Sequence, residues 1–337
     1  MSRKSWIDVV RGIGIILVII GHCHRPDILL KMIQSFHMPL FFILSGYLFH
    51  KTSESTFAFM KHKWRLYIKP YIILAVLNYA ICLFDKYLEM GICEKWKELA
   101  LRYLLGLAYS RGTWYWMPNC SPIWFLTAIF VATVLFALIM KTSKVQQYAL
   151  IGLCVLLAWI FCSIDLIKLP WNMDSAIWGV PFMYFGYVLK DCQLMERAAS
   201  HKGSSTLLAV CLFGIGGVAG YINPVDYVSM DSMICGNVFL CYGSALCIST
   251  GLLLVVYLWI PKGKVLECYG RNTIVILGFN YVINTLVYDI WDIMFQERTV
   301  PGEWLIHCAV QIVLLGLLAY AYQQMKRRRS WIGKQTA

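Results

Sequence analysis

Residues 4–24 read KSWIDVVRGIGIILVIIGHCH, and this stretch decides the kind of fold. It is apolar over most of its length and does not alternate with a period of two, as a strand of a membrane barrel would. About 20 mostly apolar residues allow a helix to cross the hydrocarbon core of a bilayer. Asp8, Arg11 and His22 lie within the stretch, and ionisable groups inside a membrane helix are costly and usually functional. The stretch therefore predicts a membrane-spanning helix that also carries chemistry.

The rest of the chain has the same character. Of its 337 residues, 59% are hydrophobic and 14% are charged, whereas a soluble domain carries about a quarter charged residues. The aromatic share of 15% excludes intrinsic disorder, and 13 cysteines are too few for a disulfide-rich secreted scaffold. We therefore expect an all-α integral membrane protein, a bundle of about ten transmembrane helices that forms a single domain over residues 1–337. The expected spans are residues 6–24, 35–50, 66–84, 122–140, 147–165, 175–190, 205–222, 235–259, 272–291 and 304–323.

The distribution of charge predicts how these spans are oriented. The net charge is +12, from 30 Lys and Arg residues against 18 Asp and Glu residues. With the N-terminus inside, more than two thirds of the basic residues fall in the inner segments and most of the acids fall outside, as the positive-inside rule requires. Both termini are then cytoplasmic, and residues 85–121 form an outer loop with an amphipathic helix over 100–109. The basic charge is thus assigned to membrane orientation, with lipids as partners and no nucleic acid; the oligomeric state stays open.

Arg11 and His22 are 11 positions apart, which is three helical turns plus 20°, so both side chains leave the first helix on one face. They lie roughly 16 Å apart along its axis. Taken singly, Arg11 reads equally well as an anchor at the inner interface, and His22 as an interfacial histidine. His24 and His37 lie at a similar depth, but no carboxylate or cysteine completes a set of ligands, so no metal is expected.

The next stretches add polar groups at both membrane faces. Residues 37–48 read HMPLFFILSGYL and place His37 at the outer end and Ser45 deeper in the second helix. A basic inner loop follows and ends in Arg65 and Lys69; such a loop binds lipid headgroups, or equally a phosphorylated soluble donor. Cys93 and Cys120 share the outer loop, and the sequence leaves undecided whether they form a disulfide.

The R-x10-H pattern of Arg11 and His22, followed by the HMPLFF segment, resembles the acyltransferase-3 family of integral-membrane acyltransferases, and more closely its fucose 4-O-acetylase-like subgroup. The resemblance extends along nearly the whole chain. Further matching pieces are residues 65–71, 122–126, 181–187, 236–237 and 270–277. One departure stands out, because many relatives carry a histidine where this chain has Asn280, and an amide does not titrate near neutral pH.

The resemblance implies an O-acetyltransferase that moves an acetyl group from acetyl-CoA, as co-substrate, to a hydroxyl of a surface glycan or lipid-linked sugar. It implies polysaccharide modification at the bacterial inner (plasma) membrane, with Arg11 and His22 as the essential pair. We expect His22 to act as general base or to carry an acyl group itself. His37 would orient His22 or bind the sugar.

General chemistry assigns the remaining candidates. Arg11, Arg65 and Lys69 would bind the phosphates of coenzyme A, because guanidinium and ammonium groups suit phosphate. Ser45 and Asn280 would donate hydrogen bonds to the oxyanion or substrate. Trp116 and Trp124, with Trp114 and Tyr115 beside them, would form a platform for the sugar, although aromatic belts at membrane interfaces look the same.

Two alternatives remain open at this point. A transporter or flippase of glycan or lipid precursors explains many helices and intramembrane charge, but not the paired motifs. A catalytically altered family member would explain Asn280.

Overall fold

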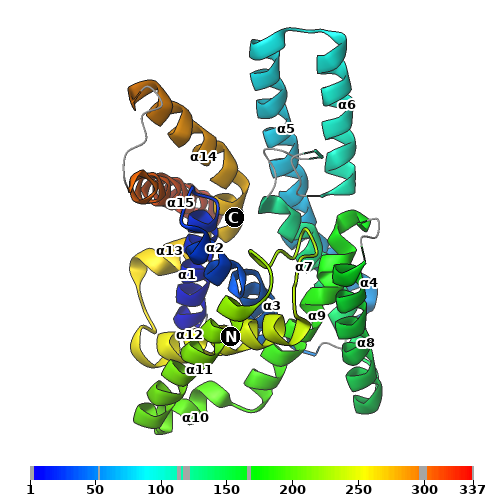
Figure 1. Cartoon of the computed structure of the whole chain (residues 1–337), viewed down its shortest axis with the longest axis vertical. Helices are drawn as coiled ribbons and strands as arrows, with labels where there is room; N and C mark the ends of the chain where they lie inside the picture. Colours follow the sequence, from blue (N-terminus) through cyan, green and yellow to red (C-terminus); the bar gives the residue numbers. More distant parts are fainter. Residues whose placement is uncertain are drawn as a thin grey trace.

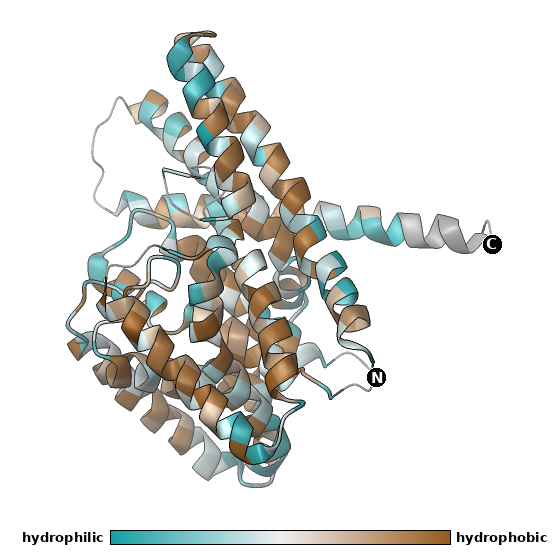
Figure 2. Ribbon diagram, turned by 90° about the vertical axis from the view of Figure 1, so that its right-hand side faces the viewer, coloured by the Kyte–Doolittle hydropathy of each residue, from teal (hydrophilic) through white to brown (hydrophobic). Residues whose placement is uncertain are grey.

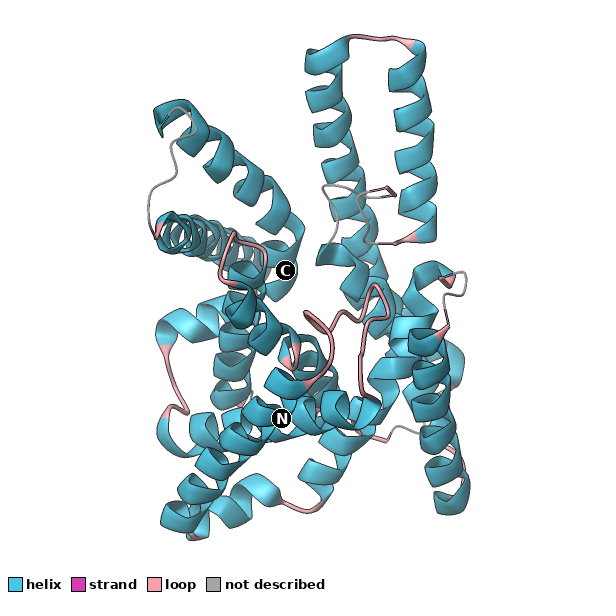
Figure 3. Ribbon diagram, viewed as in Figure 1, coloured by secondary structure: helices cyan, strands magenta, loops and turns pink. Residues whose placement is uncertain are grey.

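The computed structural model describes residues 4–51, 54–111, 115–116, 122–164, 168–295 and 302–335. These residues are almost entirely helical (Figure 1, Figure 3), and within them the only extended pairing is an isolated bridge between Ser229 and Ile234. The predicted all-α class is confirmed for this part of the chain. The elements are α1 (Ser5–Gly21), α2 (Asp27–Gln34), α3 (His37–Tyr47), α4 (Thr56–Lys63), η1 (Trp64–Ile68), α5 (Lys69–Met90), α6 (Glu94–Tyr109), α7 (Trp124–Ile139), α8 (Lys144–Ser163), η3 (Pro170–Asn172), α9 (Met173–Asp191), α10 (Leu194–Ser200), α11 (Lys202–Ile222), α12 (Val238–Trp259), α13 (Lys264–Arg271), α14 (Thr273–Phe295) and α15 (Glu303–Gln335).

Seven helical segments of the described chain are long and apolar enough to cross a membrane, and α7 is a shorter apolar helix. Hydrophobic residues run along the outward surfaces of many helices (Figure 2), as in a bundle surrounded by lipid. The chain is therefore a multi-pass membrane protein. Three of the ten expected spans are not among the seven: residues 6–24 and 122–140 form α1 and α7, of 17 and 16 residues, and residues 175–190 lie in α9. The seven segments are Asp27–Tyr47, Thr56–Met90, Lys144–Ser163, Lys202–Ile222, Val238–Trp259, Thr273–Phe295 and Glu303–Arg328.

The stretch expected as an outer loop, residues 85–121, is largely helical where the structure describes it. Helix α5 continues to Met90, and α6 returns beside it as an antiparallel hairpin that projects beyond the other helices (Figure 1). The indole of Trp96 donates to the carbonyl of Leu83 at 3.2 Å, and Tyr79 donates to the carbonyl of Ala100 at 3.1 Å. The amphipathic helix expected over residues 100–109 falls within α6, which begins earlier, at Glu94.

A wide turn interrupts the long helix that runs from Thr56 to Met90. Its residues Trp64–Ile68 are π-helical, directly before Pro70. Proline lacks a backbone N–H, and its ring collides with the carbonyl four residues earlier in a regular α-helix. The π-turn absorbs this mismatch and presents Tyr67 to the interior, where it packs against the hydrophobic core.

Basic segments that are distant in sequence meet at one end of the bundle. Lys4 lies 3.7 Å from Glu196, Lys190 donates to the carbonyl of Phe49 at 3.0 Å, and Lys141 donates to Thr56 at 2.8 Å. We call this the basic end; the N-terminus of α1 lies there. The C-terminus of α1, with His22, points to the opposite end, which we call the His22 end.

Candidate functional site

Helix α1 is held at the basic end by close backbone packing against α13. A Cβ atom added to Gly12 would collide with the carbonyl of Leu266, and one added to Gly270 would collide with the carbonyl of Asp8. Only glycine permits this approach from both sides. Gly270, the first residue of the matching piece 270–277, is therefore part of the packing contact with the first helix.

The same contact pairs charges across the two helices. The Nε atom of Arg271 lies 3.1 Å from a carboxylate oxygen of Asp8, whose side chain is 3% exposed, and its guanidinium also pairs with Glu267. Arg11, one turn beyond Asp8, is half-buried and interacts electrostatically with Tyr67 of the π-turn. A cation inside the bundle thus lies close to the wide turn of the α4–α5 helix.

At the His22 end, α14 takes the place of α13. The amide of Asn284 donates to the carbonyl of His22 at 2.9 Å. Arg271, the last residue of α13, meets Asp8, and Asn284 of α14 meets His22, so the chain from Arg271 to Asn284 runs in the same direction as α1 from Asp8 to His22. A position on α14 can therefore be assigned a depth along α1.

His37 lies beside His22 at the start of α3. Its ring is 8% exposed, its Nδ1 lies 2.9 Å from the carbonyl of Ile33, and the two imidazoles interact electrostatically. A carbonyl oxygen only accepts hydrogen bonds, so Nδ1 of His37 carries the hydrogen and Nε2 presents a lone pair. Two of the three predicted catalytic residues, His22 and His37, are therefore neighbours.

Asn280 lies one helical turn before Asn284 on the same face of α14, and hence about one turn deeper than His22. Its side chain is 0% exposed, and neither its Nδ2 nor its Oδ1 has a hydrogen-bond partner among the described residues. An unsatisfied buried polar atom costs about 1–3 kcal/mol. An amide kept at this cost beside a candidate catalytic histidine is suited to hydrogen-bond a ligand.

Residues 4–320 match the family model described as an acyltransferase domain. The chain belongs to the acyltransferase-3 family. The match covers α1, η1, α3 and α14, the elements that build the site, and it confirms the predicted family. No curated protein and no solved structure matches the chain significantly.

In this acyltransferase, Arg65 and Lys69 lie apart from Arg11. Both are exposed and line a hollow of about 510 Å³ together with Trp64. Their side chains leave the helix on the side away from Tyr67, which is the residue that faces Arg11. The structure thus brings Arg11 to the interior and leaves the other two predicted donor-binding residues on the surface.

The remaining predicted residues are dispersed through the acyltransferase. The hydroxyl of Ser45 donates to the carbonyl of Phe41 at 2.8 Å, within its own helix. Trp124 is 7% exposed and packs edge-on against Phe125 in the core, whereas Trp116 is half-buried against Tyr109. Trp114 and Cys120 lie outside the described residues, and Cys93 is an exposed free thiol.

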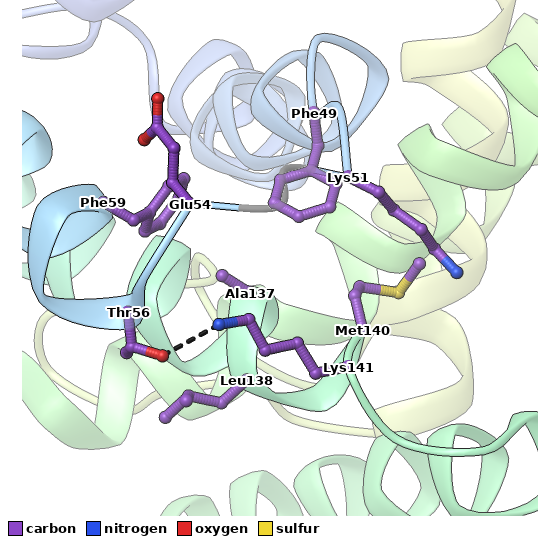
Figure 4. Close-up of a pocket in the computed structure, with 9 residues that line it drawn as sticks. All are labelled: Phe49, Lys51, Glu54, Thr56, Phe59, Ala137, Leu138, Met140 and Lys141. Carbon is purple, nitrogen blue, oxygen red and sulfur yellow. Dashed lines mark hydrogen bonds between the residues drawn. The ribbon is translucent and has the colours of Figure 1, made fainter.

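The basic end also contains a pocket of about 230 Å³ (Figure 4). The rings of Phe49 and Phe59 line it, and the ammonium of Lys141 bonds to Thr56 at its edge, while Lys51 extends beside it. The pocket therefore combines aromatic surface with two cations and one acid, Glu54.

Sequence reasoning missed a buried polar network near the His22 end. Arg111, 2% exposed, pairs with Asp174 at 2.7 Å and donates to the backbone carbonyl of Asp231. Ser175 donates to the carbonyl of Met230 at 2.7 Å, which ties α9 to the same loop. Burial raises the pKa of Asp231, and this effect exceeds the opposing influence of Arg111. This network joins the chain after α6, the start of α9 and the loop before α12, so we assign it to the framework.

Tyr67 and Asn284 were missed as well. A polar residue one turn after Asn280 on an apolar helix was the available signal for Asn284, and Pro70 was the signal for the irregular turn that carries Tyr67.

Proposed function

We propose that the protein transfers an acetyl group from cytosolic acetyl-CoA to a hydroxyl of a surface glycan or lipid-linked sugar, as in the fucose 4-O-acetylase-like subgroup. The basic end would face the cytoplasm of a bacterial plasma membrane, with both chain termini on that side, and the His22 end would face outward. Membership of the family supports acyl transfer as the reaction. The contacts along α1 support transfer from a donor at the basic end to an acceptor at the His22 end.

The donor would bind at the basic end. Its phosphates would be held by basic residues, with Arg11 the innermost cation and the pocket at Lys51 and Lys141 as a further contact at the basic end. The hollow at Arg65 and Lys69 is a separate candidate, because its Trp64 lies 6.0 Å from Trp171, measured between ring centroids, just before α9. The pantetheine arm would extend along α1 towards His22, so that the thioester arrives about three helical turns from Arg11.

At the His22 end, the imidazole of His22 would take the proton of the acceptor hydroxyl. The oxygen then attacks the thioester carbonyl, the C–S bond breaks, and the proton passes to the thiolate, which gives an acetyl ester and free coenzyme A. The lone pair on Nε2 of His37 can accept a hydrogen bond from the acceptor or from His22. The amide of Asn280 would donate to the developing oxyanion.

The observation that carries this proposal is the unpartnered amide of Asn280, buried about one turn from His22 and on the side of α14 that meets α1. It also bears on the absent histidine at this position. An oxyanion donor needs a fixed N–H and does not need to titrate, so asparagine is compatible with an active enzyme.

The test is an acetyl-transfer assay with purified protein in liposomes. Radiolabelled acetyl-CoA is supplied as donor, and the acceptor is the whole envelope glycan and lipid-linked sugar fraction from cells that lack the gene. We expect label in this fraction together with stoichiometric release of free thiol. Transport of the glycan without consumption of thioester would contradict the proposal and favour the transporter.

A further inference from the structure

The described part of the chain gathers a set of polar side chains at the His22 end that the proposed chemistry does not use. Its members come from the segment after α1, from α14 and from α15, and we call them the outer cluster. They are Cys23, Arg25, Tyr288, Trp291, His307 and Gln311.

Contacts around Cys23 hold the outer cluster together. The thiol of Cys23 lies 3.4 Å from Oε1 of Gln311, and Nη1 of Arg25 donates to the Cys23 carbonyl at 2.9 Å. The Tyr288 hydroxyl accepts from the backbone N–H of His24 at 2.6 Å. Tyr288 lies one turn after Asn284, whose amide donates to the His22 carbonyl, so the cluster lies next to the backbone of His22.

Aromatic rings form one wall of the outer cluster. The ring of His307 lies 4.4 Å from that of Tyr288 and 4.6 Å from that of Trp291, measured between centroids, and it meets both edge-on. Tyr288 and Trp291 are half-buried, whereas His307 and Gln311 are 2% and 0% exposed. The cluster therefore has a partly open aromatic rim and a buried polar base.

Five buried polar atoms of the cluster lack partners among the described residues. These atoms are both ring nitrogens of His307, Nε2 of Gln311, Nε1 of Trp291 and Nε of Arg25. Unsatisfied polar atoms are destabilising in a membrane bundle, and polar groups found there usually line the path of a substrate. Four side chains with unpartnered polar atoms lie in the cluster around Cys23. They indicate a ligand that offers several hydrogen-bonding groups.

The chemistry of the cluster selects the class of ligand. Trp291, Gln311 and Arg25 offer N–H donors, and a neutral His307 offers one donor and one acceptor. Sugar hydroxyls both donate and accept, and the C–H faces of a sugar ring pack on aromatic side chains such as Tyr288 and Trp291. We infer that the outer cluster is the subsite that binds the sugar ring of the acceptor and directs one of its hydroxyls to His22. This inference rests on the proposed function.

The test compares variants that remove polar atoms and keep an apolar side chain: leucine, which has nearly the volume of glutamine, and phenylalanine, which is smaller than tryptophan but keeps an aromatic ring. Gln311→Leu and Trp291→Phe are assayed with the envelope fraction described above as acceptor, and Gln323→Leu, three turns further along α15, is the matched control. We expect the two cluster variants to raise the KM for acceptor about tenfold, with the KM for acetyl-CoA within twofold of wild type. Thermal unfolding of Gln311→Leu should shift little, because loss of the contact with Cys23 is offset by removal of the unsatisfied Nε2.

Two results would overturn the subsite. One is an acceptor KM within twofold of wild type in both variants, which would leave ordered water as the partner of these atoms. The other is a rise in the KM for acetyl-CoA of the same size as that for acceptor.

A binding measurement without acetyl-CoA distinguishes failure of the proposed transfer reaction from failure of the proposed sugar subsite. The labelled envelope fraction is bound to purified wild type and to Gln311→Leu. Wild type that binds but does not transfer, with binding lost in the variant, would refute the transfer and retain the subsite. Equal binding by the two proteins would refute the subsite alone.

Discussion

The two ends of α1 differ in how their polar groups are satisfied. At the basic end, Asp8 pairs with Arg271, Arg271 pairs with Glu267, and α13 packs so closely that glycine is required at Gly12 and Gly270. At the His22 end, buried polar atoms on α14 and α15 have no partner in the described structure, although their helices contact α1.

This difference separates structure from chemistry within one helix. A completed ion pair against closely packed backbones fixes the position of α1, and its loss should lower stability. Incomplete hydrogen bonding is costly to the fold and useful to an enzyme, because the free groups can bond to a substrate or to a transition state. Substitutions at the His22 end should therefore impair catalysis at little cost in stability, and those at the glycine contact should do the reverse.

The largest effect is expected for His22→Ala. Loss of a general base lowers the rate by about 10²–10⁴-fold, and we expect a fall of about 10³-fold in kcat for acetyl transfer. The matched control is His201→Ala, an exposed histidine directly after α10, at the basic end and far from His22. If a correctly inserted His22→Ala protein transferred acetyl groups at the wild-type rate, His22 would not be the general base.

Asn280→Ala should lower kcat by about 10²-fold, the range found for loss of one oxyanion donor. Its unfolding temperature should change little, because the amide makes no hydrogen bond within the described protein. Asn280→Asp is the informative companion: it keeps the shape, places an anion against the oxyanion and should be at least as impaired. A variant with normal kcat and lowered stability would make Asn280 a framework residue.

Gly270→Ala tests the other end of α1. The new Cβ would collide with the Asp8 carbonyl, and overpacking of this kind costs about 1–3 kcal/mol. Gly214→Ala is the control, since nothing lies within 4 Å of that position and alanine favours a helix by about 1 kcal/mol. Thermal unfolding in detergent should therefore shift in opposite directions for the two variants, and equal shifts would contradict the close packing of α1 and α13.

The smallest of these effects is expected for Arg11→Ala, which should raise the KM for acetyl-CoA about tenfold, equivalent to about 1.4 kcal/mol. The KM for acceptor should stay within twofold, because Arg11 lies about three turns from His22. Lys97→Ala, which removes an exposed pair with Glu94, serves as the control for loss of a positive charge. A rise in the KM for acceptor alone would reverse the assignment of the two ends.

The sequence predicted what depends on local periodicity. Arg11 and His22 share one helix, so their common face follows from 100° per residue, and the apolar segments follow from their length. The partners of these residues lie on other helices: Tyr67 more than 50 positions from Arg11, and Asn284 more than 260 positions from His22. No local pattern states which faces of distant helices meet, so these contacts required the structure.

The same reasoning explains the segment expected as an outer loop. The helix predicted over residues 100–109 is part of α6, but the charged residues around Glu94 hid its true start, which depends on packing against α5 through Trp96 and Leu83. Arg65 and Lys69 show the converse. Their basic character was correctly read, but the direction of their side chains depends on the π-turn before Pro70, which changes the helical register.

The most direct test of the account is a sided transfer assay in liposomes with uniformly oriented protein. Labelled acetyl-CoA is supplied only to the basic end, and the envelope acceptor fraction only to the His22 end. We predict that label appears on the acceptor with the wild-type protein and does not appear with His22→Ala. Label that appears only when donor and acceptor share the basic end would contradict the account.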